Sequence, residues 1–270
     1  MPTVDDLERI APAKRSRDEI PEVNNQGNSL PRKKFYRARA HCNPLSDSQF
    51  PVPLQPEEYN WEAHYPEFFA RARARDGDAA EKPLVRFADV GCGFGGMLVK
   101  LSPLFPDHLA VGMEIRDKVS QYVKERCTAL RRELPGQYEN ISCIRTNSMK
   151  YLPNFFTKGQ LTKLFFLFPD PHFKTANHRR RIIQCTLLTE YAYTLAVGGI
   201  MYTITDVEEL GTWMSEKIAA HPCFERLTPE ELKSDPVVPL LFTGTEEGQK
   251  VERNEGSTFL NCFRRIAGPK

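Results

Sequence analysis

Apolar residues gather in short runs along this chain, and more polar segments with helical character separate them. A short apolar run bounded by turn residues is typical of a strand buried in a parallel sheet. Seven such runs lie at 84–90, 109–115, 140–145, 161–168, 200–205, 224–227 and 259–266. Because strand and helix patterns alternate, we predict an α/β fold with a doubly wound, mostly parallel seven-stranded sheet.

The segments between these runs carry helical signals. Residues 116–133 are charged but place Val119, Tyr122 and Val123 on one stripe, which predicts a surface helix that covers the sheet. Further helices are predicted at 96–104, 149–156, 182–196, 206–220 and 249–253. The residues Val197, Gly198 and Gly199 are predicted to stop the fourth of these six helices.

The region before the first strand has a different composition. Residues 1–33 carry basic clusters but few large apolar side chains, so we predict a disordered basic tail. Residues 34–83 are rich in prolines and aromatic rings and should wrap the surface of the main domain, which we place at 84–270. Within this wrapping segment, residues 71–82 are predicted to be a loop.

Charge and cysteine content narrow the class of protein. The chain has 270 residues and a net charge of only +2, so any nucleic-acid contact must come from local basic clusters. Its seven cysteines include no Cys-x-x-Cys pair, so we expect reduced thiols and no metal site. No apolar run approaches the ~18 residues of a membrane span, and we expect an intracellular protein without membrane association, located in the nucleus and possibly the cytoplasm.

Candidate ligand chemistry begins at the first strand, where an acid is followed by glycines 91, 93, 95 and 96. Glycine permits positive φ and lets a ligand approach the backbone, which suits a nucleotide-like cofactor. The same glycines fit G-x-G-x-x-G, so a nicotinamide cofactor, S-adenosylmethionine and an ordinary turn all stay open. Glu114 ends the next strand, at the spacing where an acid commonly meets ribose hydroxyls, although it could also be a helix cap.

Two polar loops fall near this predicted pocket. Asn147 and Ser148 follow the third strand, where they could border an adenine ring, cap a helix, or do both. Residues 243–248 contain Thr245, Glu246 and Glu247, whose oxygens could accept hydrogen bonds from an amino-acid ammonium group. For this second loop, a capping role is equally compatible with the sequence.

The second chemical centre is the segment after the central apolar strand, 169–174, in which Asp170 lies between two prolines. Open α/β sheets bind ligands at the carboxyl ends of their strands, and prolines hold a carboxylate rigidly. Nearby cations suit phosphates, and residues 35–41 mix aromatic rings with arginines in the same way. The predicted RNA contacts are Arg37, Arg39, His172, Lys174, Arg179, Arg180 and Arg181.

These motifs together resemble the tRNA (guanine-N7)-methyltransferase family, and specifically the catalytic subunit of the eukaryotic enzyme. The resemblance rests on the segments 88–96, 112–116, 166–174, 197–199, 202–206 and 245–248, in that order, and runs from about residue 34 to 266. It implies a Rossmann-like methyltransferase sheet whose last strand is antiparallel. It also implies methyl transfer from S-adenosylmethionine to N7 of a guanine in the tRNA variable loop, and a non-catalytic β-propeller partner with WD repeats.

Carried over to matching positions, the resemblance implies a catalytic role for Asp170. It implies cofactor contacts at Gly91, Glu114, Ile115, Arg116, Asn147, Ser148, Leu167, Thr245, Glu246 and Glu247. Many relatives have alanine at the position of Ser148, so there the backbone is the expected contact. Guanine N7 carries a lone pair and no proton, so its methylation needs orientation and charge stabilisation but no general base.

Three other functions fit parts of the pattern. An exocyclic-amine methyltransferase of nucleic acids would carry Asp-Pro-Pro-aromatic where this chain has Asp-Pro-His-Phe, and His172 argues against it. A nicotinamide-dependent oxidoreductase would carry a catalytic Tyr-x-x-x-Lys pair, which this sequence does not contain. A tRNA-binding scaffold without activity would not need the glycines, Glu114 and Asp170 together.

Overall fold

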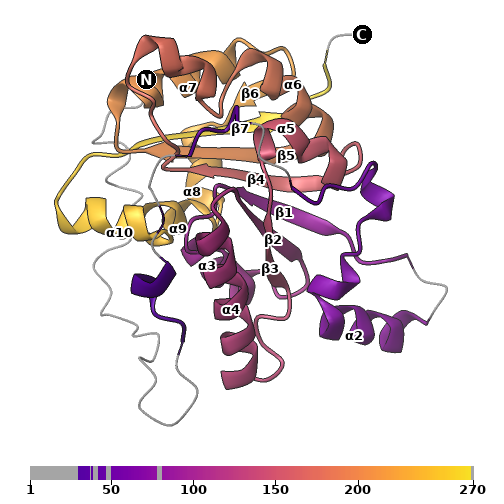
Figure 1. The fold of residues 1–270 in the computed structure, drawn as a ribbon. Coiled ribbons are helices and arrows are strands. Elements are labelled where there is room, and N and C mark those ends of the chain that lie inside the picture. Colours follow the sequence, from indigo (N-terminus) through magenta and orange to yellow (C-terminus); the bar gives the residue numbers. More distant parts are fainter. Residues whose placement is uncertain (1–29, 37, 39–41, 47–49, 78–80, 269–270) are drawn as a thin grey trace.

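A computed structural model of the chain describes residues 30–36, 38, 42–46, 50–77 and 81–268 (Figure 1). Residues 1–29 of the predicted tail and the predicted RNA contacts Arg37 and Arg39 therefore lie outside the described residues. The last residue of the predicted tail, Lys33, already belongs to a short helical turn and pairs with Glu246. Within the described part, no helix has both the length and the apolar character needed to cross a membrane. The same residues contain no group of three or more His, Cys, Asp or Glu side chains placed to hold a metal ion.

The centre of the fold is one seven-stranded sheet with the order β3-β2-β1-β4-β5-β7-β6. Neighbouring strands from β3 to β5 are parallel, and β7 pairs antiparallel with both β5 and β6. The predicted doubly wound sheet with an antiparallel last strand is thus confirmed. The strands are β1 Val85–Val90, β2 Leu109–Glu114, β3 Ile141–Arg145, β4 Leu161–Leu167, β5 Leu195–Thr205, β6 Phe224–Arg226 and β7 Phe259–Arg265.

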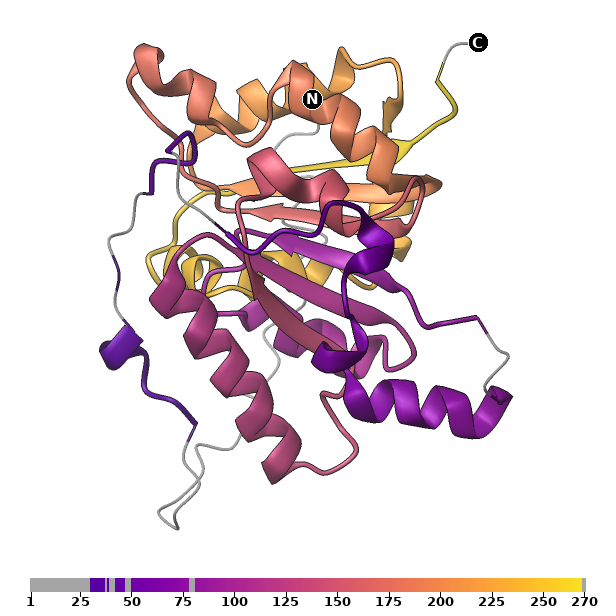
Figure 2. The same cartoon turned by 45° about the vertical axis from the view of Figure 1, so that its right-hand side comes forward.

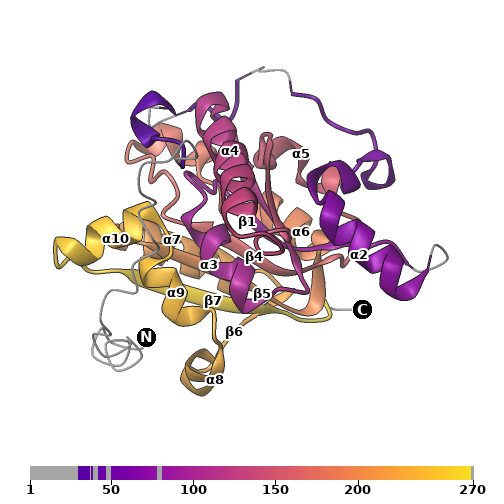
Figure 3. The same cartoon turned by 90° about the horizontal axis from the view of Figure 1, so that it is seen from below.

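Helices cover both faces of this sheet (Figure 1). On one face, α5 (Ser148–Phe155), α6 (Cys185–Thr194) and α7 (Glu208–Ala219) bury apolar side chains in one core cluster. On the other face, α3 (Gly96–Leu104), α4 (Asp117–Glu133) and α9 (Val238–Thr243) contribute to a second cluster. Seen from below, α3 and α4 lie along this second face, with α9 and α10 (Glu246–Arg253) beside α3 (Figure 3).

The segment before β1 packs on the sheet and then forms a helix. It includes the short turns η1 (Lys33–Tyr36), η2 (Pro56–Glu58) and η3 (Glu62–His64) and the helix α2 (Pro66–Asp76). Trp61, Tyr65 and Phe69 are buried, and the Tyr65 hydroxyl donates to the Ala110 carbonyl at 2.9 Å. Figure 2 shows the segment passing outside the strands to α2. The predicted loop over 71–82 is wrong up to Asp76, because alanines and arginines are good helix formers and the helix already has a buried anchor in Phe69.

Three further details differ from the sequence prediction. Helix α6 is shorter than expected, and β5 already begins at Leu195, so the segment 197–199 lies inside the strand. Gly198 has φ +88°, and the pairing with β4 shifts register there, so these glycines form a strand irregularity. The elements η4 (Thr175–Arg180), α8 (Pro229–Ser234) and α9 were not predicted, since each is too short for a clear periodicity.

Candidate functional site

The carboxyl ends of β1, β2 and β4 meet at one edge of the sheet, because these strands are parallel neighbours. The glycine turn after β1 lies at this edge. Gly91 has φ +74°, and a Cβ there would meet no atom within 4 Å, so the turn requires glycine and leaves open space beside it. At Gly96, by contrast, a Cβ would lie 2.5 Å from the Gly244 carbonyl oxygen. The turn is therefore open at one end and packed against the loop before α10 at the other.

Glu114, at the end of β2, braces this turn. Its carboxylate accepts hydrogen bonds from the Gly93 amide at 3.1 Å and from the Arg116 amide at 2.9 Å. Two more come from the Arg116 guanidinium, each at 3.0 Å. The carboxylate is only 3% exposed, and the Arg116 side chain lies over it. A ribose hydroxyl that reached Glu114 would have to replace bonds from Arg116.

Asp89, near the end of β1, was not among the predicted site residues. Its side chain is 2% exposed, and its Oδ2 atom has no hydrogen-bond partner. The pKa of Asp89 is raised to about 7, chiefly because the side chain is buried and also because the negative charges of Glu114 and Glu246 are near. A buried carboxyl with an unpaired oxygen, directly before the glycine turn, is suited to a cationic or hydrogen-bond-donating ligand. The sequence signal for it was the acid that ends the first apolar run.

The loop before α10 packs against the glycine turn, but only some of its polar side chains point toward the site. Thr245 caps α10, since its Oγ1 accepts from the Gly248 amide at 2.9 Å, so the capping role is confirmed. Glu246 accepts from Lys33 Nζ at 2.7 Å, and Arg126 Nη1 lies 3.4 Å from the same oxygen. Glu247 is 63% exposed and pairs with Lys250 on the surface of α10. The structure therefore brings Thr245 and Glu246 to the site, but it turns Glu247 toward solvent.

The other predicted cofactor residues line the same edge. Asn147 caps α5 by accepting from the Met149 amide at 3.1 Å, and its side-chain amide donates to the Pro44 carbonyl at 2.6 Å. Ser148, the first residue of α5, and Leu167, the last of β4, are buried, whereas Ile115 is half-buried after β2. Because the Asn147 side chain is held in these two contacts, a contact from its backbone is the simpler route to a ligand.

The turn after β4 has an unusual backbone. Phe168 and His172, neither of them glycine, have φ values of +49° and +44°. Between them, Asp170 is 26% exposed, and its Oδ1 accepts from the His172 amide at 3.2 Å. The His172 Nδ1 atom lies 3.8 Å from the same oxygen. Non-glycine residues in the left-handed region concentrate at functional sites, so this turn is the candidate catalytic element.

The basic run beyond this turn divides into exposed and buried side chains. Lys174 and Arg179 are exposed, and Arg180 is half-buried with its Nε atom enclosed. The prediction that Arg181 contacts RNA is wrong, because its side chain is 1% exposed and its guanidinium is bound to Glu209 at 2.8 and 2.9 Å. His172 has a 10% exposed side chain that faces Asp170, so it belongs to the catalytic turn more than to an open RNA surface.

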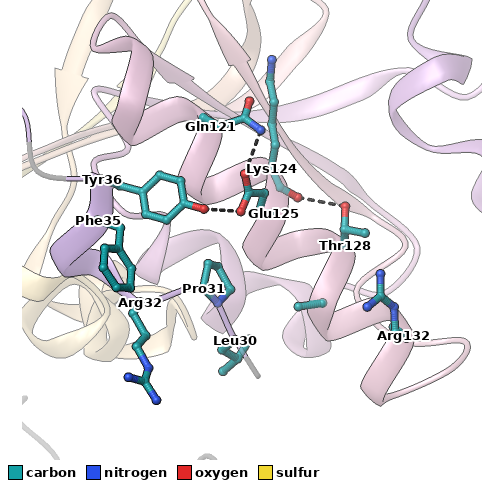
Figure 4. A pocket seen from close by; sticks show the side chains of 11 residues that line it. Leu30, Pro31, Arg32, Phe35, Tyr36, Gln121, Lys124, Glu125, Thr128 and Arg132 are labelled. Carbon is teal, nitrogen blue, oxygen red and sulfur yellow. Dashed lines mark hydrogen bonds between the residues drawn. The ribbon is translucent and has the colours of Figure 1, made fainter. Parts of the chain in front are cut away.

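A surface groove lies between η1 and α4 (Figure 4). Tyr36 donates to Glu125 there, and its ring meets that of Tyr122 edge-on at 5.4 Å. Among the described residues, none of the predicted site residues lines the groove. The candidate site is therefore the sheet edge itself.

Comparison with known proteins identifies the family of the chain. A family model described as "Putative methyltransferase" matches residues 83–260. A tRNA (guanine-N(7)-)-methyltransferase of Zea mays is 65% identical over 242 residues, which are 89% of this chain and 95% of that protein. The chain belongs to the tRNA (guanine-N(7)-)-methyltransferase family. Family members of Arabidopsis thaliana (62% identity over 90% of this chain and 95% of theirs) and Xenopus laevis (57% over 88% and 90%) are also similar.

Two groups of residues therefore lie at this edge. We call the glycine turn, Asp89 and Glu114 the donor half and the turn around Asp170 the acceptor half, after the roles that we propose for them. Asp89 is the main addition to the residues that the sequence singled out.

Proposed function

We infer that this chain transfers a methyl group from S-adenosylmethionine to N7 of a guanine in tRNA. The observation that carries the proposal is that Asp170 follows β4 at the same sheet edge where Asp89 lies near the end of β1 and Glu114 ends β2. The chain is also 65% identical to a protein named for that activity. Ligands of open α/β sheets bind at this edge.

The donor half fits S-adenosylmethionine on three points. The open space beside Gly91 admits a ligand next to the backbone. The unpaired Oδ2 of Asp89 can accept from the ammonium group of the methionyl part, and Glu114 can accept from ribose hydroxyls when Arg116 gives way. When bound, S-adenosylmethionine supplies an electrophilic methyl group on sulfur.

At the acceptor half, Asp170 orients the base. The N7 lone pair attacks without losing a proton, so no residue has to act as a general base. A carboxylate on the guanine edge that carries N1–H and N2–H can accept from both donors, which holds the ring in line. It also stabilises the positive charge that methylation leaves on the ring.

Substrate and assembly complete the proposal. We propose that the target guanine lies in the tRNA variable loop and that a β-propeller subunit with WD repeats assists tRNA binding. The small net charge of the chain means that it attracts a whole tRNA only weakly on its own, which supports a role for a partner.

We also propose a nuclear location, to which the cluster of Arg32, Lys33 and Lys34 would contribute. Microscopy of a tagged chain with these three residues changed to alanine tests this last point.

The experiment for the activity is direct mapping of the product. The purified chain, alone and with the propeller subunit, is incubated with S-adenosylmethionine and unmodified tRNA, and N7-methylguanine is located by chemical cleavage. We expect one cleavage site in the variable loop, with more product when the partner is present. Methylation on an exocyclic amine, or tRNA binding with no methyl transfer, would overturn the proposal.

A further inference from the structure

The buried Arg181 makes contacts that join two distant parts of the chain. Its Nε donates to the carbonyl of Pro171 at 2.9 Å, one residue beyond Asp170. Its two terminal nitrogens form a bidentate pair with Glu209 at 2.9 and 2.8 Å, and its guanidinium lies 4.8 Å from the ring centre of Trp213. Glu209 and Trp213 both belong to α7.

The segment between these contacts is fixed at several points. The Arg181 amide donates to the His178 carbonyl at 3.0 Å, and the ring of His178 meets that of Trp213 edge-on at 5.3 Å. The Trp213 indole nitrogen donates to the Ile183 carbonyl at 2.9 Å. The connection from β4 to α6 is therefore fixed to α7. Through its hydrogen bond to the Pro171 carbonyl, Arg181 also links the turn that contains Asp170 to α7.

The turn itself needs such support. Phe168 and His172 hold left-handed backbone conformations, which are unfavourable for residues other than glycine and persist only when neighbouring contacts impose them. Among the contacts described for Pro171, the one from Arg181 is the only side-chain hydrogen bond to its carbonyl. A planar guanidinium can bind two carboxylate oxygens and a third acceptor at once, whereas a lysine ammonium cannot reproduce that fork.

We propose that Arg181, held by Glu209, is a positioning residue that fixes the Asp170 turn in the geometry required for methyl transfer. The inference rests on the proposed function, because it takes Asp170 as the group that meets the base. Arg181 acts through the Pro171 carbonyl and touches neither substrate. Its effect should therefore appear in the rate of the transfer step and not in the affinity for tRNA.

The test compares Arg181→Lys with the parent in single-turnover methylation at saturating tRNA and S-adenosylmethionine. Small displacements of a reacting group can lower a rate by up to about 100-fold, so we expect a drop of about 10- to 100-fold. The tRNA affinity and its dependence on salt should stay at the parental values. A parental rate, or a loss of affinity with a flattened salt dependence at a parental saturated rate, would overturn the proposal.

Two further variants separate positioning from loss of stability. Glu209→Gln is the milder change, because Glu209 is half-exposed and glutamine keeps one acceptor; we expect a smaller drop in the saturated rate. This variant decides the question if Arg181→Lys does not fold, and a parental rate in it would then contradict the proposal.

Tyr191→Phe is the control, since it removes a buried 2.8 Å hydrogen bond to the Ile182 carbonyl on the same connection. It should lower the melting temperature and leave the saturated rate unchanged, and a rate loss like that of Arg181→Lys would mean that general loosening explains both.

Asp170→Asn, measured beside these variants, distinguishes this inference from the proposed function. If both Asp170→Asn and Arg181→Lys transfer methyl groups at the parental rate, the assigned role of the turn fails. If Asp170→Asn alone is slow, the turn keeps its role and only the positioning by Arg181 is refuted.

Discussion

The donor half and the acceptor half of this site are held in place by different means. The glycine turn is held by Glu114, which accepts from the Gly93 amide, and by close packing of Gly96 against Gly244 in the loop before α10. The turn around Asp170 depends on Arg181 and, through it, on Glu209 of α7. The donor half also contains a buried carboxyl with an unpaired oxygen, whereas the arginine of the acceptor half is fully paired. The donor half is thus built largely from backbone contacts of its glycines, whereas the acceptor half depends on one buried arginine side chain and its partner on α7.

The largest effect that would sharpen this contrast concerns Asp89. Its pKa rises from the usual 3.8 to about 7 in the folded chain, so folding favours the protonated form. This contribution to stability is complete below pH ~4 and is lost as the pH rises through 7, which corresponds to about 4 kcal/mol. We expect Asp89→Asn without cofactor to resist urea better than the parent at pH 8 and to lose that advantage at pH 4.

The same carboxyl should report cofactor binding. An ammonium group beside Asp89 would lower its pKa, so S-adenosylmethionine should release protons when it binds near pH 6. Calorimetry in buffers of different ionisation enthalpy measures that release, and Asp89→Asn is the control in which it should disappear. Equal proton release by parent and variant would remove Asp89 from the donor half.

A smaller effect is expected from Glu114→Gln. Loss of a charged acceptor for the ribose should weaken S-adenosylmethionine binding by about 1.5 to 3 kcal/mol, measured by calorimetry. The saturated rate of methyl transfer should change far less, because Glu114 belongs to the donor half. Unchanged cofactor affinity would show that its bonds to Gly93 and Arg116 are its whole role.

The smallest effect concerns the exposed part of the basic run. Changing Lys174 and Arg179 together to alanine should flatten the salt dependence of tRNA binding by up to about 0.9 per lost duplex phosphate contact, or about 0.7 for a single strand. Titration of tRNA at several salt concentrations measures the slope. An unchanged slope would assign these side chains to ordinary solvent exposure.

The sequence predicted the sheet well and located the glycine turn, because these signals are local. Apolar runs mark the buried strands, and the glycines that permit positive φ lie next to one another in the chain. The acceptor half was harder, since a run of three arginines does not show which one meets Glu209 across the fold. Glu247 illustrates the same difficulty. Which way its side chain points depends on where the short helix α10 begins, and the sequence does not fix that start. Residues 71–76 were predicted as a loop because few of them are apolar. They are helical because they continue the helix that begins at Pro66 and buries Phe69.

The separation of the two halves is tested most directly by Asp170→Asn, with cofactor affinity and the single-turnover rate measured on the same protein. Loss of one preorganised electrostatic group typically costs about 100-fold or more in rate. We therefore expect a rate at least about 100-fold lower, with parental affinity for S-adenosylmethionine and tRNA. A folded variant that binds both substrates normally and still methylates N7 at the parental rate would contradict the assignment of Asp170.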